Sequence, residues 1–236
     1  MANNTAMNPA HLTDAARKEL HDWFRSSPTE PKVFQEFLRP ELARSMAEAL
    51  RCLPVWERHS TAHRTSTETE DIPEEAWDGH PRRAARHFVA RALPNALEDG
   101  KMEAPHQKAL RAFLAFAVMS GGLQSWLEEG IGVEIDRSRN SLEFAAYKVG
   151  DSINVHQDLL PGRILAVNFY LDDAYRPSDG ARLGYRNEEG REFRVDPLFN
   201  SFALIPILPD CHHWVDPYEG ATTGRFTVSI GQHQVV

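Results

Sequence analysis

The sequence has few cysteines and no long apolar run, and both absences narrow the class of protein. Cys52 and Cys211 are the only cysteines, and they lie far apart in the chain. So small a number excludes a disulfide framework and favours a reduced, cytoplasmic protein. No stretch approaches the length of a membrane span, and the Asn/Ala-rich start lacks the regions of a secretory signal. We therefore expect no membrane partner.

Positive charge is also in short supply. Lysine and arginine number 26 against 34 acidic residues, which gives a formal net charge of −8. The basic residues are dispersed, so the sequence carries no electrostatic footprint for nucleic acid. A hydrophobic content of 42% is nevertheless enough for a core, and 236 residues suffice for one large domain.

The first 140 residues show mainly helical periodicity. Apolar residues recur at spacings of three and four, as in helices that bury one face. The clearest stripe is formed by Leu110, Phe113, Leu114 and Ala117. We expect helices over 12–25, from Pro40 onward, over 82–97 and over 105–129, with a strand over 33–38.

Residues 54–81 are polar and rich in Thr, Glu, His and Pro. This composition is typical of a surface loop, and we expect one here. Long loops inside compact domains are often functional, so a lid over an active-site mouth is the alternative. We expect His59, His63 and His80 to be solvated rather than bound to a metal.

After residue 140 the hydrophobic period changes to that of short strands separated by turns. This pattern favours an α+β fold with a mainly β core, a double-stranded β-helix (a jelly-roll or cupin-like barrel) buttressed by the N-terminal helices. We expect one domain, with a tail and helix at 1–32, helical support at 33–140 and the catalytic core at 141–236. The expected strands are 142–149, 153–156, 163–171, 181–185, 191–195, 201–207, 213–215 and 225–231.

Within this core, His156 and Asp158 are two residues apart. On an extended chain such residues point the same way, so an imidazole and a carboxylate lie side by side. By itself, such a pair is more often a hydrogen-bonded surface pair. A third ligand is available at His212 or His213, and two histidines with one carboxylate form the facial metal site of non-haem Fe(II) oxygenases.

A lone arginine opens the final apolar strand. Arg225, Thr227 and Ser229 share one face of that strand if it is extended. A planar guanidinium with hydroxyls beside it is a good receptor for a carboxylate, because its fork can bind both oxygens. A protein that only binds metal has no need of such a receptor.

Taken in order, these motifs resemble the Fe(II)/2-oxoglutarate-dependent oxygenases, in particular their prolyl 4-hydroxylase-like branch. The resemblance covers roughly residues 141–231, and the ordered set is more specific than any one member. The matching motifs are Tyr147-x-x-Gly150, His156-x-Asp158, Arg163 to Asp173, Val195-Asp-Pro, Phe202-Ala-Leu-Ile-Pro, His213-x-Val and Arg225-x-Thr-x-Ser.

The resemblance implies that His156, Asp158 and His213 bind Fe(II). The family's His-x-Val spacing matches His213 rather than His212. Halogenases of the family carry Gly or Ala in place of Asp158, so hydroxylation or another oxidation is expected here. O2 would be the oxidant, with ascorbate as a stimulant.

The resemblance also implies a site for the cosubstrate. Arg225 is expected to bind the distal carboxylate of 2-oxoglutarate, assisted by Ser229 or Thr227. The hydroxyl of Tyr170 should reach the same carboxylate, although an ordinary core tyrosine is the alternative. Tyr147 is expected to contact cosubstrate or substrate.

Three further residues are candidates for substrate contact. Glu143 shares a strand face with Tyr147 that should look into the barrel. A carboxylate there is costly without a partner, so Glu143 would meet either a substrate cation or a plain salt bridge. Arg163 matches a substrate-contacting arginine of the hypoxia-sensing prolyl hydroxylases, although its flanking loops look unrelated. Asn168 lies on the strand face of Tyr170.

The expected function is hydroxylation of an unactivated C–H bond in a small molecule, an amino acid or a biosynthetic intermediate. The reaction would be coupled to decarboxylation of 2-oxoglutarate to succinate. A prolyl or peptidyl hydroxylase acting on a protein or peptide is the first alternative, and an open groove beside the metal would favour it. A jelly-roll that binds metal without catalysis is the second.

Overall fold

The computed structural model describes residues 5–26, 28–65, 68–98 and 102–235. Its main helices are α1 (Asp14–Arg25), α2 (Pro40–Arg51), α3 (Leu93–Glu98), α4 (Ala104–Leu114) and α5 (Gly122–Ile131). Its strands are β1 (Lys32–Phe34), β2 (Glu57–His63), β3 (Thr69–Asp71), β4 (Arg83–Val89), β5 (Ser141–Tyr147), β6 (Ser152–His156), β7 (Arg163–Tyr170), β8 (Leu183–Arg186), β9 (Glu192–Val195), β10 (Ser201–Pro206), β11 (His212–Val215) and β12 (Gly224–His233).

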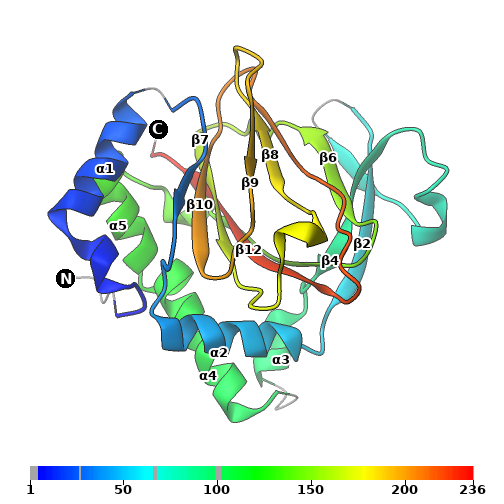
Figure 1. Ribbon diagram of the computed structural model, residues 1–236, viewed down its shortest axis with the longest axis horizontal. Helices are drawn as coiled ribbons and strands as arrows, with labels where there is room; N and C mark the ends of the chain where they lie inside the picture. Colours follow the sequence, from blue (N-terminus) through cyan, green and yellow to red (C-terminus); the bar gives the residue numbers. More distant parts are fainter. Residues whose placement is uncertain (1–4, 27, 66–67, 99–101, 236) are drawn as a thin grey trace.

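The strands form one sheet that curls into a nearly closed antiparallel barrel (Figure 1). Their order is β1-β10-β7-β12-β5-β4-β6-β11-β8-β9, with β2 and β3 attached beside β4. All eight strands expected after residue 140 are present, and their ends shift by about two residues at most. The double-stranded β-helix is therefore confirmed.

The helices pack against the outer face of β5, β7, β10 and β12. Leu20, Met46, Phe113 and Trp126 join the strands' outward side chains in one hydrophobic core. α1 begins at Asp14, two residues after the expected start, because the Thr13 hydroxyl accepts a hydrogen bond from the Ala16 N–H. No helix among the described residues is long and apolar enough to cross a membrane.

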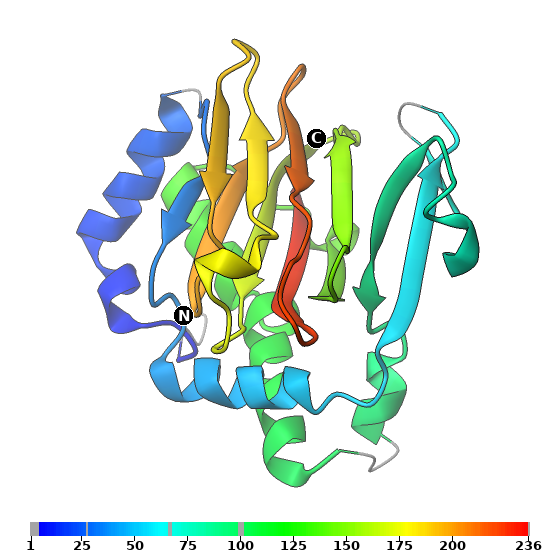
Figure 2. The ribbon, with the colours of Figure 1, turned by 45° about the vertical axis from the view of Figure 1, so that its right-hand side comes forward.

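Two expectations for residues 54–97 are wrong. The surface loop expected over 54–81 instead contains the hairpin of β2 and β3, and the helix expected over 82–97 is β4 followed by the short α3. Figure 2 shows β2 and β4 as a long pair at the side of the barrel. Pairing of β4 with β2, β5 and β6 outweighs the modest helix propensity of its Arg and Ala residues.

The strand expected at 33–38 is shorter than the sequence predicted. β1 ends at Phe34, because Glu36 turns the chain with a φ of 51°. The N–H of Phe37 then donates to the carbonyl of Asn200 at 2.9 Å, which keeps the segment against β10.

A buried carboxylate fastens the β2–β4 pair to the barrel. Asp151 has no exposed surface and lies in the turn between β5 and β6. Its carboxylate is 2.6 Å from Nη1 of Arg58 on β2 and 3.2 Å from Nε of Arg86 on β4. It also accepts the N–H of Lys148 at 2.8 Å. One side chain therefore connects three strands.

Candidate active site

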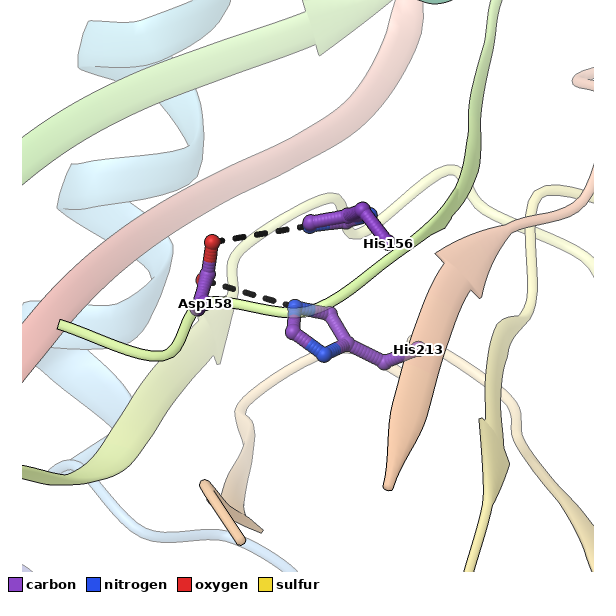
Figure 3. Close-up of side chains that lie close together, drawn as sticks. All are labelled: His156, Asp158 and His213. Carbon is purple, nitrogen blue, oxygen red and sulfur yellow. Dashed lines mark ion pairs between the residues drawn. The ribbon is translucent and has the colours of Figure 1, made fainter. Parts of the chain in front are cut away.

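The barrel brings His156, Asp158 and His213 together. His213 of β11 lies opposite His156 of β6, and Asp158 follows two residues after β6 ends. One ligand atom from each lies within 4.8 Å of the others. Oδ2 of Asp158 is 3.4 Å from His213 Nε2, and Oδ1 is 3.8 Å from His156 Nε2 (Figure 3). Adjacent ligands about 2.1 Å from one ion lie about 3 Å apart, so the group fits one divalent metal after a small inward shift.

His156 and Asp158 are in the protonation states that metal binding needs. Burial and the neighbouring His213 lower the pKa of His156 to about 4. Its Nδ1 lies 2.8 Å from the carbonyl of Asn154, to which it donates, so Nε2 keeps its lone pair. Burial raises the pKa of Asp158, but the hydrogen bond with His213 and the charge of Arg163 outweigh it, so this pKa lies well below its usual value.

The structure separates the two candidate histidines of β11. Neighbours on a strand point to opposite sides. His213 is 8% exposed and faces Asp158, whereas His212 turns away and its Nδ1 lies 3.2 Å from the carbonyl of Asp210. His213 is therefore the residue that the fold brings to the other two.

Arg225 lies buried inside the same barrel, with 2% of its surface exposed. Its Nε donates to the carbonyl of Ala181 at 2.6 Å, and Nη1 donates to Thr227 Oγ1 at 3.2 Å. Nη2 is buried and has no hydrogen-bond partner among the described residues. No carboxylate of the described chain forms an ion pair with this guanidinium. A buried cation of this kind is costly unless an anion joins it, so the pocket suits a carboxylate ligand.

A bulge in β12 turns Arg225 inward. Two residues lie between Gly224 and Thr227, but only one lies between their partners Tyr147 and Ala145 on β5. The extra residue gives Arg225 a φ of 50°, which is unusual for a residue other than glycine. Such strain persists where surrounding contacts impose it, and it often marks a ligand site.

Tyr147 and Tyr170 flank the guanidinium of Arg225. The guanidinium carbon lies 4.5 Å from the ring centre of Tyr147 and 5.6 Å from that of Tyr170. Burial raises the pKa of Tyr147 to about 12 and raises that of Tyr170 as well, although Arg225 opposes both shifts. Both phenols therefore keep their protons at neutral pH and can donate to a carboxylate.

The other expected contacts lie nearer the mouth of the barrel. Ser229 stands opposite Asn168 on one side and Glu143 on the other, two residue pairs beyond Thr227. The amide Nδ2 of Asn168 donates to the Tyr170 hydroxyl at 3.4 Å. Arg163 Nη2 lies 3.1 Å from Asp158 Oδ2, so this arginine contacts the candidate metal ligand itself.

A cavity of about 270 Å³ opens beside His156 and Asp158. β2, β4 and β5 supply its far wall through His59, His63, His87 and Glu143. The sequence predicted His59 and His63 to be solvated, and it gave no role to His87. Alternation of positions 59, 61 and 63 was the signal that could have placed them on one strand face.

Neither a protein-family model nor a curated protein matches this chain by sequence. Several solved structures are similar in fold. A prolyl 4-hydroxylase from Pseudomonas putida superposes with a TM-score of 0.64 at 15% identity, covering 93% of this chain and 99% of that one.

Two further structures show the range of proteins with this fold. A prolyl hydroxylase from Trichoplax adhaerens, in complex with a peptide fragment of hypoxia inducible factor, gives a TM-score of 0.65 at 14% identity, with 98% and 96% of the two chains covered. The dioxygenase for auxin oxidation 1 from Arabidopsis thaliana, bound to 2-oxoglutarate, gives 0.55 at 14% identity, with 93% and 90% covered. The chain thus has the fold of the Fe(II)/2-oxoglutarate oxygenases, with prolyl hydroxylases among its structural neighbours.

Proposed function

We propose that this protein is an Fe(II)/2-oxoglutarate-dependent oxygenase that hydroxylates a C–H bond of a small molecule. The observation that carries the proposal is the pairing of two features inside one barrel. A facial set of two imidazoles and a carboxylate lies at the metal cavity, and a buried guanidinium with an unpaired nitrogen lies deeper in the barrel. A site that only stored a metal would need the first feature but not the second.

Each residue of the candidate active site has a separate role in the proposed reaction. His156, Asp158 and His213 hold the metal and leave its other positions open. Arg225 binds the distal carboxylate of 2-oxoglutarate, the Tyr170 hydroxyl donates to it, and the surrounding burial keeps water out. When bound, Fe(II), 2-oxoglutarate and O2 together supply the oxidation, with succinate and CO2 as coproducts.

The size of the cavity favours a small substrate. Its volume of about 270 Å³ is bounded by β2 and β4, and it leaves little room for a folded chain. A peptide substrate is the second candidate, because a larger apolar groove of about 690 Å³ shares Glu143 with the cavity. Incubation with proline-containing peptides and mass spectrometry of the products distinguishes them, since a peptide hydroxylase adds one oxygen to its substrate.

Anaerobic titration of metal-free protein with Fe(II) and then 2-oxoglutarate tests the proposed function. Chelation of the keto acid to iron gives a visible charge-transfer band, which we expect in the wild type. His213→Ala should abolish the band, Arg225→Gln should require far more cosubstrate, and the matched control His212→Ala should behave as wild type. Iron binding without a band would favour the non-catalytic alternative and would remove the role given to Arg225.

A further inference from the structure

We propose that the substrate carries an ammonium group and that the carboxylate of Glu143 binds it at the wall of the metal cavity. This inference rests on the proposed oxygenase function and specifies its substrate class.

Glu143 lies where a bound substrate can reach it. It stands on the same face of β5 as Ala145 and Tyr147, which point into the barrel. The ladder between β4 and β5 ends at the pair Val89 and Ala145, so no β4 residue pairs with Glu143. Its side chain is 49% exposed and lines the same cavity as His156 and Asp158.

The carboxylate of Glu143 has an incomplete set of partners. Oε1 lies 3.3 Å from Nε2 of His87, whose ring stacks on Tyr147. Among the described residues, no lysine or arginine forms an ion pair with Glu143, and nothing hydrogen-bonds its second oxygen. Burial raises the pKa of Glu143, but the hydrogen bond with His87 and the nearby His59 and Arg91 lower it further, so the group is ionised at neutral pH.

Arg91, whose charge acts on Glu143, is already engaged elsewhere. Nη2 of Arg91 lies 2.9 Å from Nδ1 of His59, and Nη1 lies 3.7 Å from a carboxylate oxygen of Asp71. Burial and the neighbouring His87 lower the pKa of His59, so this imidazole is neutral. The wall facing the candidate metal therefore carries one ionised carboxylate whose charge complements a ligand cation.

The shape of the site favours a compact cation on an apolar body. An ammonium has three donors and fits a small cavity better than a planar guanidinium does. Glu143 also borders the apolar groove, which is lined by Leu93, Leu97, Leu114 and Met119 among others. An amine held at Glu143 can therefore present a carbon to the metal side while its apolar part extends into the groove.

Binding to protein loaded with Zn(II) and 2-oxoglutarate tests the inference without turnover. The probes are the standard amino acids, the amines formed by their decarboxylation, and the Nα-acetyl derivatives of the same amino acids, followed by ligand-observed NMR and then by calorimetry. We expect at least one probe with a free ammonium group to bind and its acetylated counterpart to bind at least about tenfold more weakly. The inference is wrong if no free amine binds or if acetylation makes no difference.

Two variants separate a direct contact from a general effect of charge. Glu143→Gln keeps the length of the side chain and its contact with His87 but removes the charge, so the preference for free amines should disappear. Asp71→Asn removes one negative charge from the neighbouring rim and should keep the preference. Equal losses in both variants, or no loss in Glu143→Gln, would overturn the inference.

Failure of the inference about the substrate can be distinguished from failure of the proposed oxygenase function. The charge-transfer band depends on the metal ligands and Arg225, and Glu143→Gln should leave it intact. A band without any amine preference removes only the inference about the substrate, whereas loss of the band in the wild type removes the oxygenase proposal itself.

Discussion

The backbone N–H of Arg225 donates to Oδ2 of Asp172 at 2.6 Å, and this hydrogen bond holds the residue in its left-handed conformation. Asp172 is 3% exposed, lies two residues after β7 ends, and also accepts the N–H of Ala174 at 3.0 Å. The side chain thus links the end of β7 to the bulge of β12. We infer from this hydrogen bond that Asp172 orients the guanidinium of Arg225.

Asp172→Ala should therefore weaken cosubstrate binding while sparing the metal. Without its acceptor the bulge can relax, and the guanidinium loses its position over Tyr147 and Tyr170. We expect the apparent Kd for 2-oxoglutarate to rise about tenfold, with Fe(II) affinity unchanged, in the anaerobic titration. Asp173→Ala is the matched control, because among the described residues that side chain forms an ion pair only with Arg51, at the surface. An unchanged Kd in Asp172→Ala would show that the bulge of β12 keeps its conformation without the Asp172 hydrogen bond.

The Tyr170 hydroxyl offers a second test of the cosubstrate pocket. Its pKa is raised by burial, so it acts as a neutral donor throughout the working range of pH. Tyr170→Phe should raise the Kd for 2-oxoglutarate roughly fivefold, because one neutral hydrogen bond typically contributes about 1 kcal/mol. The factor should be the same at about pH 7 and about pH 9, because the phenol does not ionise between them. A factor that shrinks at the higher pH would mean that the hydroxyl titrates.

Much of the barrel could be predicted from the sequence, because its strands have recognisable local sequence patterns. Each strand after residue 140 carries alternating or continuous apolar residues between clear turns, and the register then places His156 opposite His213. The resemblance of ordered motifs supplied the rest of the candidate site. The choice between His212 and His213 needed only that motif, and the structure orients the same residue toward Asp158.

The wall of the cavity could not be predicted in the same way. β2 and β4 face a polar cavity, so their inward residues include histidine and threonine and the apolar alternation is lost. The Arg and Ala residues of β4 are good helix formers, and only pairing with distant strands makes the segment extended. The role of Asp172 could not be predicted either, because this residue and Arg225, whose N–H it accepts, are 53 positions apart in the sequence.

We predict that Arg163 holds the carboxylate of Asp158, a candidate metal ligand, in position. It lies 3.1 Å from Asp158 Oδ2 and is mostly buried, so it limits how that carboxylate can rotate. Its positive charge also repels a metal ion, and we expect the loss of positioning to dominate. Arg163→Met should lower Fe(II) or Mn(II) affinity about tenfold, measured by calorimetry. Arg163→Lys should retain only part of the wild-type metal affinity, because a single ammonium cannot hold the Asp158 carboxylate in one orientation as a planar guanidinium does. Tighter binding in Arg163→Met would show that repulsion is the larger effect.

Asp151 should be the most costly single truncation in the β2–β4 attachment. Removing this buried carboxylate leaves Arg58 and Arg86 with the exposed partners Glu74 and Asp78, and breaking a buried ion pair typically costs about 3–5 kcal/mol. Urea unfolding of Asp151→Ala should show a loss of that size in the free energy of unfolding. Asp78→Ala removes another partner of Arg86, but that carboxylate is 88% exposed, so about 0–1 kcal/mol should be lost.

The same variant separates the cavity wall from the cosubstrate pocket. Loosening β2 and β4 displaces His59 and His87, whereas Arg225 is held by β12 and by Asp172. In protein that remains folded, Asp151→Ala should therefore form the charge-transfer band with near-normal cosubstrate affinity while losing affinity for its amine ligands. Parallel losses of both would mean that the hairpin and the barrel interior form one cooperative unit, and that the wall cannot move without the pocket.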